Sequence, residues 1–221
     1  MRKRHVLPAV FIVAEAILYY LLLTAGGNAQ VVSMFLSVVL CFVFALLHTR
    51  KSNALRTAAL AFTVCADWCL VVCSLAQQLY GMVFFLGTQT LYALYLYRKG
   101  RRKSLALTRI VLIAAIEAVA YFVLGSKMDP LAAVSVAYYA ILFVNIIDTF
   151  TQAGKDLLFP IGLLLFLLCD TVVGLQVAAG GYLPITEGSW LYRILFPGFN
   201  LAWVFYLPSQ VLIALSQQRR R

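Results

Sequence analysis

Charged side chains are scarce in this chain: Asp, Glu, Lys and Arg make up 12% of its 221 residues, whereas 63% are hydrophobic. Soluble domains carry about twice that fraction of charged residues. The polar stretches between the apolar runs are also short, which leaves no room for a soluble domain. These absences exclude an ordinary soluble enzyme. They indicate an integral membrane protein, in which any chemistry takes place within the helical bundle.

Histidine is nearly missing, and cysteine is confined to the apolar runs. The two histidines, His5 and His48, lie in the N-terminal tail and at the end of a run, whereas a zinc site needs several convergent His or Cys ligands. The five cysteines imply no disulfide framework. Cys65, Cys69 and Cys73 recur every four residues, so we expect them to share one helix face and allow close packing there. We therefore expect no metal and no cofactor.

Long apolar runs are what the chain has in abundance, and eight of them suit a helix that crosses the hydrocarbon layer. The predicted fold is an all-α polytopic membrane protein with eight transmembrane helices in a single domain, residues 1–221. The fifth run is short unless residues 104–109 extend it. The predicted spans are 6–24, 31–48, 58–76, 81–97, 110–124, 131–149, 157–179 and 194–215.

The net charge of +10 is distributed among helix ends rather than gathered on a polar domain, which argues against a nucleic-acid partner. If eight spans alternate, all but two of the 18 Lys and Arg residues lie on one side, Arg56 and Arg109 included, and only Lys127 and Arg193 lie opposite. The positive-inside rule then places both termini in the cytoplasm of a multi-pass cell-membrane protein. We expect the basic clusters to contact anionic bilayer lipids.

Two aspartates, Asp67 and Asp170, lie near the middle of the third and seventh runs. An ionisable side chain at that depth costs several kcal/mol and usually marks a functional site. We therefore interpret Asp67 and Asp170 as functional residues rather than structural ones.

The two halves of the chain resemble each other in their polar residues. VAEAILYYLL aligns with AIEAVAYFVL, and TQTLYALYLYRKGRR aligns with SQVLIALSQQRRR. Because each half has an even number of crossings, the predicted duplication is parallel, with halves 1–103 and 104–221. Chance similarity would align only Leu and Val, whereas here the costly polar residues align as well. The aligned pairs are Glu15 with Glu117, Asp67 with Asp170, and Gln89 with Gln210.

Apart from the aspartates, these polar residues have structural alternatives. Glu15 and Glu117 are equally well explained as protonated side chains hydrogen-bonded to a neighbouring helix, and Gln89 and Gln210 as interhelical contacts. Asp148 lies near the end of the sixth run, where we expect it to be solvated.

Four short segments, in the expected order along the chain, are similar to motifs of the YhhN family of membrane proteins, whose characterised members are lysoplasmalogenases. GLLLFLLCD, which ends at Asp170, resembles Gly-Ala-x-Leu-Phe-x-x-Ser-Asp, and ADWCL, which contains Asp67, resembles Gly-Asp-x-x-Leu. FFLGTQTLY, which ends at Tyr92, resembles a segment that ends in His-x-x-Tyr. YLPSQVLI, which begins at Tyr206, resembles Tyr-x-x-Ala-Gln-x-Leu-Ile.

Four departures from these motifs are informative. Gln89 stands where the family has His, Cys169 where it has Ser, Ala66 where it has Gly, and Ser209 where it has Ala. The loss of an imidazole removes a group that changes charge near neutral pH, which puts a proton-shuttle role at position 89 in doubt. Gln89 retains the ability to orient water or a headgroup oxygen.

The resemblance implies hydrolysis of the vinyl ether of a lysoplasmalogen or related lysolipid, with Asp67 and Asp170 as the catalytic residues. Vinyl ethers yield to acid, so one carboxyl group must be protonated, and burial in a low-dielectric interior favours that neutral form. The other, ionised, would stabilise the oxocarbenium ion and accept a proton from water, as in glycosidases. The residues expected to bind the substrate are Gln89, Tyr92, Tyr206, Gln210, Glu15 and Glu117, with Tyr138 and Asn145 as additions.

Two other functions fit the same residues. Parallel repeats and midplane carboxyl groups are equally expected in a proton-coupled transporter or a lipid-translocating protein. A third possibility is a lipid-binding protein without catalytic activity. Only the family resemblance favours the enzyme.

Overall fold

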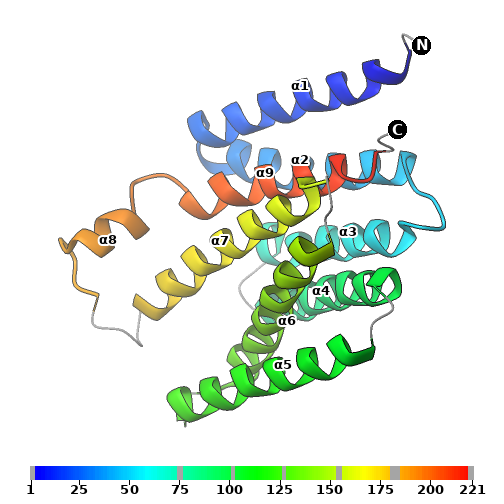
Figure 1. Ribbon diagram of the computed structural model, residues 1–221. Helices are drawn as coiled ribbons and strands as arrows, with labels where there is room; N and C mark the ends of the chain where they lie inside the picture. Colours follow the sequence, from blue (N-terminus) through cyan, green and yellow to red (C-terminus); the bar gives the residue numbers. More distant parts are fainter. Residues whose placement is uncertain are drawn as a thin grey trace.

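The computed structural model of the chain describes residues 3–73, 77–100, 103–125, 128–152, 156–179 and 185–218. Helices make up nearly all of these residues and none of them forms a strand, so the all-α prediction is confirmed (Figure 1). The elements are α1 (Lys3–Thr24), α2 (Gly27–Leu47), α3 (Ala54–Asp67), η1 (Trp68–Val72), α4 (Gln78–Gly100), α5 (Lys103–Leu124), α6 (Pro130–Gln152), α7 (Leu158–Ala179), α8 (Trp190–Leu195) and α9 (Leu201–Leu215).

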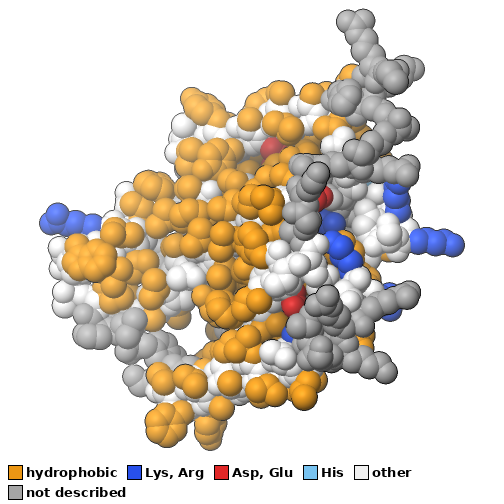
Figure 2. Space-filling view, viewed as in Figure 1, with side chains coloured by type: hydrophobic (Ala, Val, Ile, Leu, Met, Phe, Trp, Pro, Cys, Tyr) orange, Lys and Arg blue, Asp and Glu red, His pale blue; other side chains and the backbone are white. Residues whose placement is uncertain are grey.

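Within the described residues, six helices are long and apolar enough to cross a membrane: α1, α2, α3 together with η1, α4, α6 and α7. Hydrophobic side chains cover most of the face shown in Figure 2, and the basic side chains lie near its edges. This is the surface that a bilayer requires, because lipid tails solvate apolar side chains and not charges. The predicted fifth and eighth spans are not among the six. The fifth forms the 22-residue α5, which extends back to Lys103.

The predicted eighth span, 194–215, is wrong as one continuous helix. It is divided into the six-residue α8 and the 15-residue α9. Pro197 and Gly198 separate them, and Gly198 has a φ of +85°, a conformation that side-chain-bearing residues avoid. Asn200 then begins α9, because its side chain accepts a hydrogen bond from the backbone N–H of Trp203. At about 1.5 Å per residue, α9 is shorter than the hydrocarbon layer is thick.

The third span begins at Ala54 and changes from an α-helix into the π-helical turn η1 directly after Asp67. π-Helical turns are rare and are frequently found at functional sites. Along this segment Cys69 is buried, whereas Cys65 is exposed. The close packing expected of this face is therefore wrong for Cys65, although Cys65 and Cys69 do line one surface pocket. All five cysteines are free.

The helices pack in a pattern that repeats after four. In the first half α1 contacts α2, α2 contacts α3, and α3 contacts α4. In the second half α5 contacts α6, α6 contacts α7, and α7 contacts α9. The halves meet through α4 against α6 and α9 against α2, which are equivalent contacts if α9 corresponds to α4. Helices α1 and α5 lie at opposite edges of the bundle in Figure 1, and α3, α4, α6, α7 and α9 form its interior.

Close approach of α7 and α9 depends on Gly162. A Cβ atom at this position would lie 2.7 Å from Cγ1 of Ile213 and 3.1 Å from the carbonyl oxygen of Ser209. Only a residue without a side chain allows this distance between the two helices, as in other membrane helix pairs with small residues at the contact. Gly162 thus sets the separation of the helices that carry Asp170 and Tyr206.

Candidate functional site

Asp67 is the last residue of α3, and its side chain is 2% exposed. The hydroxyl group of Tyr206 on α9 donates a hydrogen bond of 2.6 Å to Oδ2 of Asp67. Tyr206 is itself buried. A carboxyl group removed from water needs such a donor, because an unpaired polar group in an apolar interior costs several kcal/mol.

Asp170 on α7 has an equivalent partner. The hydroxyl group of Tyr138 on α6 donates a hydrogen bond to Oδ2 of Asp170. Tyr138 is buried, whereas Asp170 retains part of its exposure. The two aspartates therefore have matching tyrosine partners, but Asp67 is buried whereas Asp170 is partly exposed.

The two carboxyl groups belong to one cluster. Asp67 and Asp170 lie close enough to interact electrostatically. The Tyr138 hydroxyl interacts with both carboxyl groups, and so does the thiol of Cys169. The two acids, which lie on the third and seventh predicted spans, are thus neighbours in the folded chain, as predicted. Their side chains reach tyrosines on neighbouring helices of the bundle.

Aromatic rings from four helices surround the pair. The ring of Phe166 on α7 lies 5.2 Å from that of Tyr206 and 6.3 Å from that of Tyr138, measured between centroids. Phe85 on α4 lies 5.6 Å from Phe166, 5.7 Å from Tyr138 and 6.3 Å from Tyr206. These distances are those of favourable aromatic contacts. The rings fix the directions of the tyrosine hydroxyls and keep the surroundings of the carboxyl groups apolar.

The glutamines form a second polar layer, four residues beyond the aromatic rings on α4 and α9. Gln89 and Gln210 are fully buried. Asn145 on α6 donates from Nδ2 to the carbonyl oxygen of Gln89 at 2.9 Å and to its Oε1 at 3.1 Å. Among the described residues, Nε2 of Gln89 and Oε1 of Gln210 have no hydrogen-bond partner. Four residues along a helix correspond to about 6 Å, so these free groups lie within one small molecule's length of the aspartates.

The two glutamates have different surroundings from the aspartates. Glu15 on α1 is buried and accepts hydrogen bonds from Ser37 at 2.6 Å and Cys41 at 3.4 Å, both on α2. This is the interhelical contact given above as its structural alternative. Glu117 lies on α5, which packs against α6, and it is only partly buried. No hydrogen bond connects either glutamate to the aspartate cluster within the described part of the chain.

Asp148 was expected to be solvated, and that expectation is wrong. It is 5% exposed and forms an ion pair with Arg109, which joins α6 to α5. Neighbouring apolar residues gave no sign that the acid and the base would meet. The pair lies at helix ends, where the low dielectric of the packed protein favours pairing over separate charges.

Sequence reasoning did not single out Phe85 and Phe166 as part of the site. Each lies one helical turn from a predicted residue, Phe85 before Gln89 and Phe166 before Asp170. A spacing of four residues places both side chains on one helix face, and this was the only sign that the two phenylalanines belong to the site. Phenylalanine is so common in apolar helices that the spacing did not distinguish these two. Within the described residues no group of His, Cys, Asp and Glu side chains could hold a metal ion.

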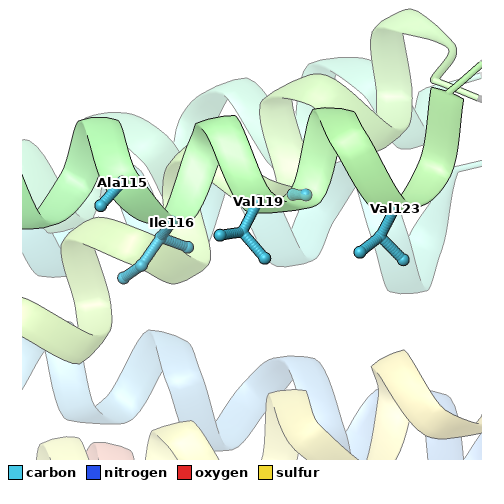
Figure 3. Close-up of a pocket in the computed structure, with 5 residues that line it drawn as sticks. Ala115, Ile116, Val119 and Val123 are labelled. Atoms are coloured by element: carbon cyan, nitrogen blue, oxygen red, sulfur yellow. The ribbon is translucent and has the colours of Figure 1, made fainter.

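A surface pocket of about 510 Å³ lies away from this cluster. It is an apolar groove along α5, and the side chains that line it point away from the helix axis, as Figure 3 shows. No predicted site residue lines it. The lining residues are Ala115, Ile116, Val119, Ala120 and Val123.

Comparison with known proteins gives one match. A model of the YhhN family matches residues 28–217, which include both aspartates, their tyrosine partners and both buried glutamines. Neither a comparison with curated proteins nor one with solved structures finds a match.

Proposed function

The chain belongs to the YhhN family, and on that premise we propose that it is a membrane-embedded hydrolase that cleaves the vinyl ether bond of lysoplasmalogens or a related lysolipid. The observation that supports this most is the pair of aspartates in one cluster, each bound by a tyrosine hydroxyl. Acid-catalysed hydrolysis needs both a proton donor and a group that activates water. Two neighbouring carboxyl groups supply both.

The reaction follows from the chemistry of vinyl ethers. A carboxylic acid protonates the alkene carbon distal to oxygen, which leaves an oxocarbenium ion at the carbon bonded to oxygen. Water adds to that carbon, its proton passes to the other carboxylate, and the resulting hemiacetal collapses to a fatty aldehyde and a glycerophospho-alcohol. Two carboxyl groups with opposite protonation states are the arrangement that glycosidases use for a similar cation.

We assign the proton-donor role to Asp67 and water activation to Asp170. Asp67 is 2% exposed and lies deeper in the bundle, whereas Asp170 retains access to its surroundings. Two like charges at close range in a low dielectric are unfavourable, so the pair retains one proton. The tyrosine hydroxyls each occupy one oxygen of their carboxyl group and leave the other for substrate or water.

Gln89 and Gln210 are proposed to bind the glycerol part of the substrate. Their free amide groups lie about 6 Å beyond the aromatic layer, which suits the oxygen atoms next to a vinyl ether held at the aspartates. Gln89 would donate from Nε2, and Gln210 would accept at Oε1. This assigns position 89 a binding role and not the charge-changing role of an imidazole.

We also propose that α5 and α9 complete eight crossings, that the chain is a parallel four-plus-four duplication, and that both termini are cytoplasmic. The repeated contact pattern of the helices supports the duplication. In Figure 1 α1 begins and α9 ends at the same end of the bundle, as an even number of crossings requires. The bias of Lys and Arg toward that side supports a cytoplasmic location in the cell membrane.

The test is release of fatty aldehyde by the purified protein in detergent. The substrate is a lysoplasmalogen, and the control lipid is its saturated alkyl-ether analogue, which has no alkene to protonate. We expect aldehyde from the first lipid alone, and its loss in Asp67→Asn and Asp170→Asn but not in the exposed-charge control Glu187→Gln. Absence of aldehyde together with proton flux that depends on the same carboxyl groups in liposomes would overturn the hydrolase in favour of transport.

A further inference from the structure

Arg56 is a buried cation in the first turn of α3, 6% exposed. Its guanidinium carbon lies 4.2 Å from the ring centroid of Phe159 and 5.2 Å from that of Tyr95. Its Nη2 donates to the carbonyl oxygen of Ile213 at 3.4 Å and to the hydroxyl group of Ser216, at the end of α9. The cation thus stabilises a helix C-terminus, where carbonyl groups carry partial negative charge.

Both of these hydrogen bonds use Nη2 of Arg56, and neither gives the guanidinium group a carboxylate partner. In the described part of the chain the ion pair is Arg109 with Asp148, so no carboxylate neutralises Arg56. Its Nε, although buried, has no hydrogen-bond partner there. A guanidinium group has five N–H donors in a planar fork, and leaving a buried donor unpaired is costly.

Two more buried donors next to Arg56 are also free. Thr57, the next residue, donates at 2.9 Å to Oε1 of Gln217, which leaves Nε2 of that amide without a partner among the described residues. The hydroxyl group of Tyr92 is fully buried, has no partner there either, and is close enough to Arg56 to interact with its charge. The site therefore holds one positive charge and three unpaired donor groups: Nε of Arg56, Nε2 of Gln217 and the hydroxyl group of Tyr92. No described residue supplies an acceptor for them.

We propose that Arg56, Tyr92 and Gln217 form a binding site for a phosphate group. Phosphate supplies several acceptor oxygens and the negative charge that the site lacks, and the planar fork of arginine matches its geometry. The phosphate comes either from a lipid headgroup at this membrane surface or from a small soluble phosphate ester.

This site is separate from the hydrolytic site proposed above. Arg56 precedes Asp67 by eleven residues, and Phe159, beneath the guanidinium group, precedes Asp170 by eleven. Eleven helical residues correspond to about 16 Å. The vinyl ether and the phosphorus of a lysoplasmalogen are separated by about six bonds of about 1.5 Å, or at most about 9 Å. Measured along the helices, Arg56 and Phe159 therefore lie farther from the aspartates than the phosphorus of the substrate lies from its vinyl ether.

The experiment measures the thermal unfolding midpoint of the full-length protein in a phosphate-free maltoside detergent. One arm adds glycerol 3-phosphate, with glycerol as its control. The other adds phosphatidic acid to the micelles, with diacylglycerol as its control. A ligand that binds the folded state raises the midpoint. Because Asp67→Asn leaves this site untouched, it should respond like the wild-type protein, which separates this test from the test of hydrolysis.

The informative variant is Gln217→Glu, with Arg98→Gln as the control that removes an exposed charge at the same end. Glutamate keeps the acceptor for Thr57 and provides Arg56 with a carboxylate, so the unliganded protein should be at least as stable as the wild-type protein. Affinity for phosphate should fall by about tenfold or more, because one donor is replaced by a negative charge. Arg98→Gln should keep the full response.

A midpoint raised by phosphatidic acid alone assigns the site to lipid headgroups, and one raised by glycerol 3-phosphate alone assigns it to a soluble ester. Either result supports the site if Gln217→Glu abolishes it. No shift with either compound in the wild-type protein overturns the proposal. So does a shift that Gln217→Glu retains, or one that Arg98→Gln weakens as much as Gln217→Glu does.

Discussion

The hydroxyl group of Tyr206 and the carboxyl group of Asp67 are joined by a hydrogen bond of 2.6 Å, although 139 residues separate them in the chain. This bond connects the end of α3, where the π-helical turn begins, to the middle of α9. It fixes one oxygen of Asp67 and leaves the other free. The direction of the free oxygen is thus set by a helix from the opposite half of the chain.

Removal of the hydroxyl group in Tyr206→Phe should slow hydrolysis more than it weakens folding. Asp67 becomes a carboxylate as it gives up its proton, and a hydrogen bond to a charged group contributes about 1.5–3 kcal/mol, so we expect aldehyde release to fall by about tenfold to a hundredfold. The ring remains and continues to contact Phe166. The measurement is kcat for aldehyde release. Tyr121→Phe, at an exposed position, is the matched control, and equal rates in the two variants would show that the Tyr206 hydroxyl has no role.

Asp67→Gly and Asp170→Gly should differ in chemical rescue by formate. Each substitution should slow hydrolysis by about 10²–10⁴-fold, the usual effect of losing a general acid or base. Because Asp170 retains some exposure and Asp67 does not, formate should restore part of the activity of Asp170→Gly only. Rescue is read from aldehyde release at increasing formate concentration. Rescue of Asp67→Gly alone would reverse the assigned roles.

Gly162→Ala should separate α7 from α9 and destabilise the bundle. The added methyl group would meet Cγ1 of Ile213 and the carbonyl oxygen of Ser209, and such overpacking costs about 1–3 kcal/mol. Gly174→Ala on the same helix is the control, because no atom lies within 4 Å of the position that its Cβ would take. We expect a lower unfolding midpoint for Gly162→Ala alone. If both substitutions have the same effect, helix propensity and not close packing decides the result.

The ion pair between Arg109 and Asp148 should couple α5 to α6. Asp148→Asn leaves a largely buried guanidinium group without its acid, which costs about 3 kcal/mol in comparable sites. The double variant Arg109→Gln/Asp148→Asn removes both charges and should be less destabilised than Asp148→Asn. Unfolding midpoints of the singles and the double give the coupling energy. Additive effects would mean that the two side chains do not interact.

Much of this architecture could be predicted because apolar length and buried acids are direct consequences of the bilayer. Asp67 and Asp170 stood out since nothing else in their runs carries charge, and the proposed duplication would give them equivalent positions. The tyrosine partners were harder to identify. Tyr206 and Tyr138 are amphipathic residues among 12 tyrosines, and only the packing shows which hydroxyls reach a carboxyl group.

Other features depend on tertiary contacts that composition does not reveal. The break before α9 was visible in Pro197 and Gly198, but the apolar residues around them resembled a continuous span. Arg56 counted as one of many basic residues at helix ends, yet two aromatic rings cover it. Burial of such a charge depends on which rings and carbonyl groups the neighbouring helices bring to it.

The central claim, that the aspartate pair hydrolyses a vinyl ether by protonating carbon, is tested most directly by the isotopes in the released aldehyde. In D₂O enriched with ¹⁸O, the account predicts one deuterium on the carbon next to the aldehyde carbon and ¹⁸O in the aldehyde, when the product is trapped by reduction at once. Both Asp67→Asn and Asp170→Asn should release it far more slowly. Aldehyde without that deuterium, ¹⁸O in the glycerol product instead, or unchanged rates in both variants would contradict the account.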